Sequence, residues 1–227
     1  MEMYGEEWAA RYEEYANASI AGREGMFRLA EACLADLPDD ARILVVGCGT
    51  GSEILALASR YPGWRFEAVE PAQGMVAVCR QRLERAEISH RVTLHQRGVE
   101  DLRIEPCHAA TAILVSQHIV SDSGASRFFS EIAANLIDGA VLFCADITLP
   151  EETNSRNAML RTWQQQAVTA GLPADAPASL ISRFGKDLVP RTPAGVEKLL
   201  SSAGFGLPSQ VFQSTIYRAW ISQLALS

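Results

Sequence analysis

Residues 42–53 read RILVVGCGTGSE, and this stretch decides the fold. Arg42–Val46 predicts a buried strand, because four aliphatic residues follow Arg42 without interruption. A G-x-G-x-G turn comes next, and a helical pattern begins at Ser52. Glycines permit a tight turn, and the start of a helix aims backbone N–H groups at whatever lies above it. This order predicts a binding site for the polar part of a nucleotide-like ligand.

The composition is typical of a globular enzyme and excludes several other classes of protein. The 227 residues include 48% hydrophobic and 21% charged residues, which is enough apolar material for one large α/β domain. A net charge of −7 disfavours tight non-specific binding to DNA or to anionic membranes. The five cysteines are scattered without a C-x-x-C pair, so we expect no metal site, no disulfide framework and a reducing cytoplasm. No apolar run approaches the roughly 20 residues of a membrane span.

Strands and helices are expected to alternate along the first two thirds of the chain. The expected strands are Arg42–Val46, Trp64–Glu70, Arg91–Gln96, Thr111–Ser116 and Val141–Ile147. The expected helices between them are Ser52–Arg60, Gln73–Ala86 and Ser126–Leu136, the last of which is closed by Asp138 and Gly139. Alternation of this kind, with apolar strands, predicts a mostly parallel sheet covered by helices on both faces.

The ends of the chain predict additions to this sheet within a single domain, residues 1–227. We expect an N-terminal helical cap at 1–40 that is broken near Gly22 and Gly25, a cofactor-binding core at 41–150, a helical lid at 151–190, and a last helix and β-hairpin at 191–227. Thr192 and Pro193 predict the start of that helix. The hairpin joins Ser209–Ile216 to Tyr217–Ala225, and a short turn makes such strands antiparallel. The expected sheet has seven strands.

The spacing of the glycines distinguishes between candidate cofactors. A dinucleotide-binding turn reads G-x-G-x-x-G and needs a glycine where this chain has Ser52, which disfavours a nicotinamide oxidoreductase. The run Gly47–Gly51 instead resembles the first motif of the class I S-adenosylmethionine-dependent methyltransferases. The resemblance implies a Rossmann-like fold, with S-adenosylmethionine held by Gly47, Cys48, Gly49 and Gly51. Val45 departs from the pattern, because the family usually has an acid there that helps to hold the amino-acid end of the cofactor.

The end of the second expected strand supports the same cofactor. Glu70 stands at its tip, where a carboxylate can accept hydrogen bonds from both hydroxyls of a ribose. The following Pro71 and Met75 also fit the family pattern. The resemblance implies that Met75 lies against the adenine, although the side chain could equally belong to the core.

Two later strand ends complete the expected cofactor site. Gly98–Leu102 resembles the family's G-D-A-E-D-L, which places Val99 and Glu100 beside the adenine. Gly98 replaces the usual Asp, so either Glu100 or the backbone would read the adenine amino group. Ser116 follows the fourth expected strand, where residues of the family line the cofactor.

Three basic residues are candidates for the charged ends of the ligands. His118 could act on the acceptor or be an ordinary loop histidine. Arg183 falls where carboxy-S-adenosylmethionine synthases, one branch of the family, have a lid arginine that binds the extra carboxylate. Arg23 could bind the carboxylate of the cofactor. A solvated side chain is the alternative for both arginines.

The leading hypothesis is methyl transfer from S-adenosylmethionine to a small organic acceptor. Two alternatives stay open, a carboxy-S-adenosylmethionine synthase-like enzyme of tRNA wobble-uridine modification and a non-catalytic S-adenosylmethionine-binding subunit. No catalytic residue is predicted, because the methyl group is already activated and the protein mainly aligns the reactants. A homodimer is left open. The apolar side chains of the cap and lid would either line the acceptor pocket or simply pack, and they are Trp8, Tyr12, Tyr15, Met159 and Trp163.

Overall fold

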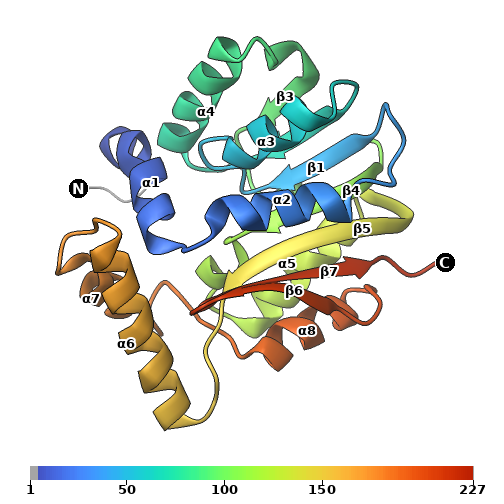
Figure 1. The fold of residues 1–227 in the computed structure, drawn as a ribbon. Coiled ribbons are helices and arrows are strands. Elements are labelled where there is room, and N and C mark those ends of the chain that lie inside the picture. The colour runs from blue at the N-terminus through green and yellow to red at the C-terminus, as the bar shows by residue number, and fades with distance from the viewer. Residues whose placement is uncertain (1–4, 227) are drawn as a thin grey trace.

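Strand β1 (Arg42–Val46) lies near the centre of a seven-stranded sheet in the computed structural model, which describes residues 5–226 (Figure 1). The other strands are β2 (Arg65–Val69), β3 (Val92–His95), β4 (Cys107–Ile113), β5 (Leu136–Ile147), β6 (Ser209–Ser214) and β7 (Tyr217–Gln223). Their order is β3-β2-β1-β4-β5-β7-β6. Strands β1 to β5 are parallel, and β7 is antiparallel to both β5 and β6. The predicted mostly parallel sheet with a C-terminal antiparallel hairpin is therefore confirmed.

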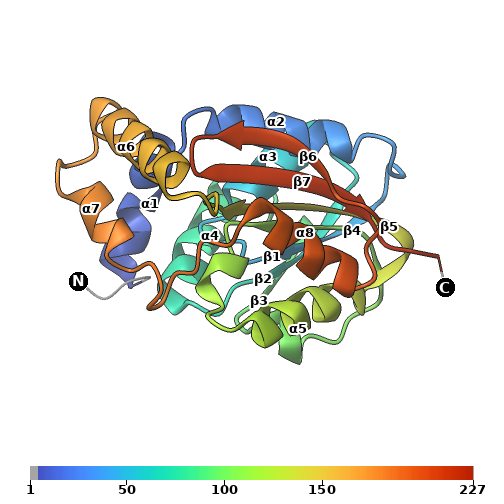
Figure 2. The ribbon, with the colours of Figure 1, turned by 90° about the horizontal axis from the view of Figure 1, so that it is seen from below.

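Helices cover both faces of this sheet (Figure 2). They are α1 (Glu6–Ser19), α2 (Arg23–Cys33), α3 (Ser52–Arg60), α4 (Gln73–Arg85), α5 (Asp122–Ala133), α6 (Thr153–Thr169), α7 (Ala176–Ile181) and α8 (Pro193–Ser202). Ile43 and Val45 of β1 pack with apolar side chains of α3 and α4. Leu44 and Val46 point to the opposite face and pack with side chains of α5 and α8. The strict alternation along β1 separates the core into these two layers.

Helices α1, α6 and α7 gather beside the sheet, at the end where the parallel strands finish (Figures 1 and 2). Trp163 of α6 is fully buried among apolar side chains there, and its indole N–H donates to the Ser19 carbonyl at 3.0 Å. Its ring also meets that of Tyr217 edge-on, with the ring centres 6.4 Å apart. Packing, the alternative left open for the lid residues, accounts for Trp163.

The N-terminal helices break at one of the two predicted glycines. Gly22 has a φ of +77° and stands immediately before α2, whereas Gly25 lies within α2. An isolated glycine costs a helix only about 1 kcal/mol, so Gly25 is tolerated. Thr192 caps α8 as predicted, since its hydroxyl accepts the Gly195 N–H at 3.0 Å.

The predicted end of the helix before β5 is wrong. Helix α5 ends at Ala133, and Leu136 already belongs to β5, so Asp138 and Gly139 lie inside the strand. Gly139 has a φ of +76°, and the pairing of β4 with β5 shifts register opposite this part of the strand. A glycine with a positive φ occurs both at helix ends and at strand irregularities. The presence of glycine in the sequence therefore does not distinguish the two.

Strand β4 is also displaced from its predicted position. It begins at Cys107, so Cys107 and His108 lie within the strand rather than before it. It ends at Ile113 because Leu114 has a left-handed backbone with a φ of +61°. Ser116 consequently lies in a short 3₁₀ turn, Ser116–His118, instead of at the strand end.

The glycine turn depends on conformations that only glycine adopts easily. Gly47 has a φ of +67°, and a Cβ built there would collide with a methyl group of Val115. Gly51 has a φ of +84°, and its Cβ would lie 2.8 Å from the Cys79 sulfur. Both positions combine a left-handed backbone with close contact, which explains why the turn needs glycine.

The substitution Gly47→Ala, made with and without Val115→Ala, separates the cost of backbone strain from the cost of the steric clash. We expect it to lower the free energy of unfolding by about 2–4 kcal/mol, of which backbone strain supplies about 1–2 kcal/mol and the clash with Val115 the rest. In a Val115→Ala background only the backbone part should remain. Urea unfolding of the four proteins measures this, and an equal cost in both backgrounds would contradict the steric part.

Candidate functional site

The carboxylate of Glu70 joins the end of β2 to the glycine turn. It accepts the Gly49 N–H at 3.0 Å through one oxygen and the Ala72 N–H at 2.9 Å through the other. Burial raises the pKa of Glu70 above its usual value, although both N–H groups favour the carboxylate. Strands β2 and β3 lie on one side of β1, and β4 and β5 lie on the other. Ligands of α/β sheets bind at the carboxyl ends of the strands where the strand order changes direction in this way. Glu70 therefore stands where a ribose-binding acid is expected.

A pocket lies between the glycine turn and the first two helices. It is lined by Tyr12, Ile20, Arg23, Met26, Phe27, Gly47, Cys48, Gly49, Thr50, Ser52, Glu53, Ile113 and Leu114. Four residues predicted to bind the cofactor are thus brought together, namely Arg23, Gly47, Cys48 and Gly49. Gly51 is not part of the lining but stands immediately before α3. The pocket is bounded by the turn on one side and by α1 and α2 on the other.

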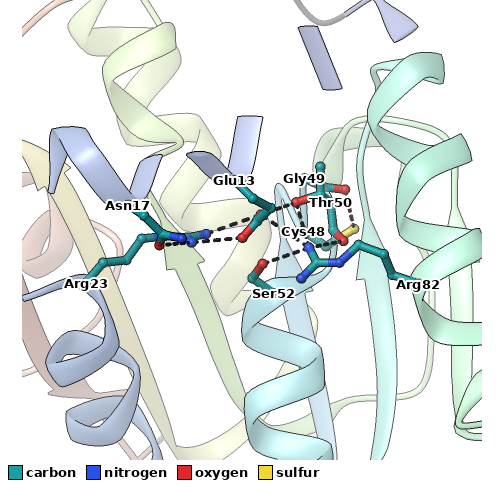
Figure 3. Close-up of polar contacts among 8 residues, drawn as sticks. All are labelled: Glu13, Asn17, Arg23, Cys48, Gly49, Thr50, Ser52 and Arg82. Atoms are coloured by element: carbon teal, nitrogen blue, oxygen red, sulfur yellow. Dashed lines mark hydrogen bonds and ion pairs between the residues drawn. The ribbon is translucent and has the colours of Figure 1, made fainter. Parts of the chain in front are cut away.

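Glu13 of α1 connects this turn to three other elements (Figure 3). Its carboxylate lies 2.9 Å from the Arg23 guanidinium and 3.2 Å from that of Arg82 on α4, and it accepts a hydrogen bond from the Thr50 hydroxyl. Arg82 also donates to the Thr50 carbonyl at 2.9 Å and to the Ser52 hydroxyl at 2.8 Å. One acid therefore ties α1, α2 and α4 to the glycine turn.

The electrostatics of Glu13 follow from these contacts. Burial alone would raise its pKa, but the hydrogen bond and charge of Arg23, together with the hydroxyls of Thr50 and Ser52, lower the pKa to about 2. The carboxylate is therefore charged at neutral pH. Its contacts stabilise the position of α1 over the pocket.

Glu53 is a second acid that borders the pocket, and it is only 6% exposed. It lies in the first turn of α3 and accepts a hydrogen bond from the Thr111 hydroxyl of β4. Burial raises the pKa of Glu53 to about 7, against the opposing effects of Thr111 and of the Arg23 charge. This carboxyl group is therefore close to its titration point at neutral pH.

The residues predicted around the adenine lie outside this pocket. Met75 and Val99 are buried, at 3% and 2% exposure, whereas Pro71 and Glu100 are exposed. The Glu100 carboxylate occupies the space that a Cβ on Gly98 would fill. An acid therefore stands beside the position where the family pattern has Asp, although it comes from two residues further along.

Ser116, which was predicted to line the cofactor, is bonded to a buried acid. Its hydroxyl donates to Asp146 at 2.7 Å, and the Gln117 N–H donates to the other Asp146 oxygen at 3.1 Å. Burial raises the pKa of Asp146 to about 7, although Ser116, Arg191 and Gln117 favour the carboxylate. Arg191 donates to the Ser116 carbonyl at 3.1 Å. These contacts fix the turn after β4, so Ser116 has a structural partner.

His118 and Arg183 lie near each other although 65 positions separate them in sequence. The His118 residue keeps more than a third of its surface exposed. Withdrawal of its ring from water, together with the Arg183 charge, nevertheless lowers the pKa of His118 to about 4. Arg183 pairs with Asp187 at 2.9 Å. The two candidates for acceptor binding thus form one group, with a neutral imidazole beside a guanidinium.

Four residues of this region were not predicted from the sequence, namely Glu13, Glu53, Arg82 and Asp146. Each stands within or next to a correctly predicted element, but no motif marks it. Only Glu53 carried a usable signal, because it is an acid in the first turn of the helix after the glycines, on the buried side. The partners of the others are distant in sequence, and nothing local indicates them.

Residues 5–226 contain neither a cluster of metal-ligating side chains nor a membrane-spanning helix. No group of three or more His, Cys, Asp or Glu side chains in this range is placed to hold a metal ion. No helix in it combines the length and apolar character that a membrane span requires.

Glu13→Gln is expected to destabilise the protein in a pH-dependent way. The pKa of this group is about 2 in the folded protein and 4.5 when unperturbed, so its stabilisation is present above pH 4.5 and is lost as the pH falls towards 2. We expect the variant to lose about 1–3 kcal/mol of unfolding free energy at pH 7, allowing for partial exposure. Urea unfolding between pH 7 and 3 measures this, with exposed Glu14→Gln as the control. A difference that does not change with pH would contradict the assignment.

Comparisons with known proteins agree with this geometry. Residues 43–139 match a family described as a methyltransferase domain. The malonyl-[acyl-carrier protein] O-methyltransferase of Geobacter sulfurreducens is 39% identical over 77 residues, which cover 34% of this chain and 28% of that protein. The carboxy-S-adenosyl-L-methionine synthase of Campylobacter lari is 20% identical over 185 residues, or 82% of this chain and 78% of that protein.

Solved structures share the fold at low sequence identity. Human N-acetylserotonin methyltransferase, solved with its cofactor, superposes with a TM-score of 0.62 at 17% identity, over 88% of this chain and 51% of that one. CalO1, a methyltransferase of calicheamicin biosynthesis, has a TM-score of 0.61 at 18% identity, over 89% of this chain and 56% of that one. The chain thus spans about half the length of these solved proteins. The matched residues 43–139 include the glycine turn, and they identify this part of the chain as a methyltransferase domain, with S-adenosylmethionine as its cofactor.

Proposed function

We propose that this protein transfers a methyl group from S-adenosylmethionine to a small organic acceptor. The observation that carries the proposal is the glycine turn of β1 with Glu70 fixed beside it at the end of β2. The cofactor supplies a methyl group on a positively charged sulfur, so the leaving group departs as a neutral thioether. The protein then has to hold both reactants in line and exclude water.

The proposed cofactor site extends along the ends of three strands. Glu70 accepts hydrogen bonds from the ribose hydroxyls, and backbone groups of Gly47, Cys48, Gly49 and Gly51 surround the polar chain. Pro71, Met75 and Val99 offer apolar surface to the adenine, and Glu100 reads its amino group. Arg23 binds the carboxylate at the amino-acid end. Its guanidinium borders the pocket and is already held by Glu13.

The acceptor is proposed to bind beside the turn after β4, under the lid. His118 is neutral at physiological pH, and its lowered pKa makes it a weak base, so its imidazole can accept a hydrogen bond from the hydroxyl of a phenol and orient it. Arg183 lies close to it and can orient a negatively charged acceptor. Tyr12 of α1 borders the neighbouring pocket and gives it an aromatic wall. This surrounding fits a small, partly apolar acceptor with an anionic group.

The proposal also includes the class of acceptor, the cellular location and the oligomeric state. We propose a small-molecule acceptor, no role in DNA binding and a cytoplasmic location, on the grounds of the net charge of −7 and the five unpaired cysteines. A homodimer is the assembly to test, and size-exclusion chromatography with light scattering measures it directly.

Calorimetry with S-adenosylhomocysteine tests the cofactor site. We expect the wild-type protein to bind and Glu70→Gln to bind about tenfold to a hundredfold more weakly, because a charge-assisted hydrogen bond to the ribose is lost. The exposed Glu84→Gln on α4 should bind like the wild type. Absence of binding to the wild-type protein would overturn the proposal.

Mass spectrometry of any co-purified cofactor distinguishes S-adenosylmethionine from its heavier carboxylated form.

Transfer of a labelled methyl group to a panel of phenols, carboxylic acids and amines tests the acceptor site. Arg183→Met should lower kcat/KM for anionic acceptors by about tenfold to a hundredfold and leave neutral acceptors within a few-fold, since only an anion loses its partner. The control is Arg127→Met, because Arg127 is an exposed arginine of α5 whose salt bridge lies at the surface. An equal loss for charged and neutral acceptors would contradict the role of Arg183.

A further inference from the structure

Glu53 is a buried acid at the pocket whose position differs from that expected in the family pattern. Glu53 lines the same pocket as Gly47, Gly49 and Arg23, and its carboxylate accepts a hydrogen bond from the Thr111 hydroxyl. An isolated buried carboxyl costs stability, because burial disfavours its charged form. Hydrophobic residues surround the same sheet face, so a leucine here would pack without that cost. The acid therefore calls for an explanation beyond packing.

The register of the sheet places this carboxylate next to Val45. Thr111 of β4 is paired directly with Val45 of β1. Paired residues of neighbouring strands point to the same face, and Val45 packs on the face that α3 covers. The Glu53 side chain extends from α3 towards that face, where its carboxylate accepts a hydrogen bond from Thr111. It thus occupies the neighbourhood in which an acid at position 45 would have placed its own carboxylate.

We propose that Glu53 replaces the acid missing at position 45 and, together with Arg23, forms a paired site for a zwitterionic α-amino acid group. Glu53 receives the ammonium and Arg23 the carboxylate of the amino-acid end of the cofactor. This assignment rests on the proposed function. Arg23 is fixed by Glu13 at 2.9 Å and by the Asn17 side-chain oxygen at 2.8 Å. These contacts hold its guanidinium at the pocket, and its charge is felt at Glu53.

The site is adapted to a positively charged ligand group. Without a ligand, burial raises the pKa of Glu53 to about 7, so near neutral pH the group is partly protonated. An ammonium placed against it favours the carboxylate and drives the proton off. The other titratable or charged side chains that border the pocket are Tyr12 of α1, Arg23 of α2 and Cys48 of the turn, while β4 contributes only apolar residues to its lining. Binding of the ammonium should therefore release a proton.

Two ligands that differ only in the amino-acid end test the assignment. S-adenosylhomocysteine carries the ammonium and carboxylate, whereas 5′-methylthioadenosine has the same nucleoside and sulfur without them. We expect Glu53→Gln to bind S-adenosylhomocysteine about tenfold to a hundredfold more weakly and to bind methylthioadenosine within about twofold of wild type. Adding Val45→Asp to Glu53→Gln should restore most of the lost affinity. Exposed Glu84→Gln serves as the control for both ligands.

The wild-type protein alone gives a second readout. Calorimetry at pH 6.5 in buffers of different ionisation enthalpy should show that S-adenosylhomocysteine releases about half a proton or more, and that methylthioadenosine releases none. Affinity for S-adenosylhomocysteine should rise between pH 6 and 8 accordingly. This measurement tests the role of Glu53 even if the variants do not fold.

Several results would overturn the assignment. Unchanged binding of S-adenosylhomocysteine by Glu53→Gln, an equal loss for both ligands, or no proton release by the wild type would each do so. If the wild-type protein binds neither ligand, the proposed function itself fails. If it binds both and only the comparison of variants fails, the methyltransferase proposal stands and the role of Glu53 is wrong.

Discussion

The hydrogen bond from the Gly49 N–H to the Glu70 carboxylate is the contact on which the site depends. It requires a backbone that turns away from β1 tightly enough to face the end of β2, and the left-handed conformations of Gly47 and Gly51 supply that turn. The parallel register of β1 and β2 brings the two strand ends level. One local constraint therefore positions the start of α3, the buried acid of β2 and the pocket between them.

The fold was largely predictable from the sequence because its signals are local. An apolar run followed by glycines marks β1, and Thr192 with Pro193 marks α8, so these elements begin where expected. The errors arose where one residue type serves two purposes. Gly139 resembles a helix end but belongs to a strand irregularity, since nothing in the sequence shows that β5 starts before it.

The site was predictable only where motif and strand end coincide. Glu70 and the glycines stand at such places, and the structure brings them together. Glu13 could not be found in this way, because its role comes from Thr50 and Arg82, which lie 37 and 69 positions away. The prediction that Ser116 lines the cofactor stays a prediction, and the bond of its hydroxyl to buried Asp146, 30 positions on, was not foreseen. Such pairings depend on tertiary contacts that no local pattern encodes.

The two departures from the family pattern share a physical explanation. At position 45 the strand carries valine, and a carboxylate reaches the same sheet face from Glu53 on the following helix. At position 98 the chain carries glycine, and the Glu100 carboxylate fills the space that its side chain would take. A binding site requires a charged group at a particular point in space, and side chains from different backbone positions can place their carboxylates there. The absence of an acid at positions 45 and 98 is a reason to consider a non-catalytic subunit. With a carboxylate present at both places, that reason loses its force, and methyl transfer is the function that the arrangement favours.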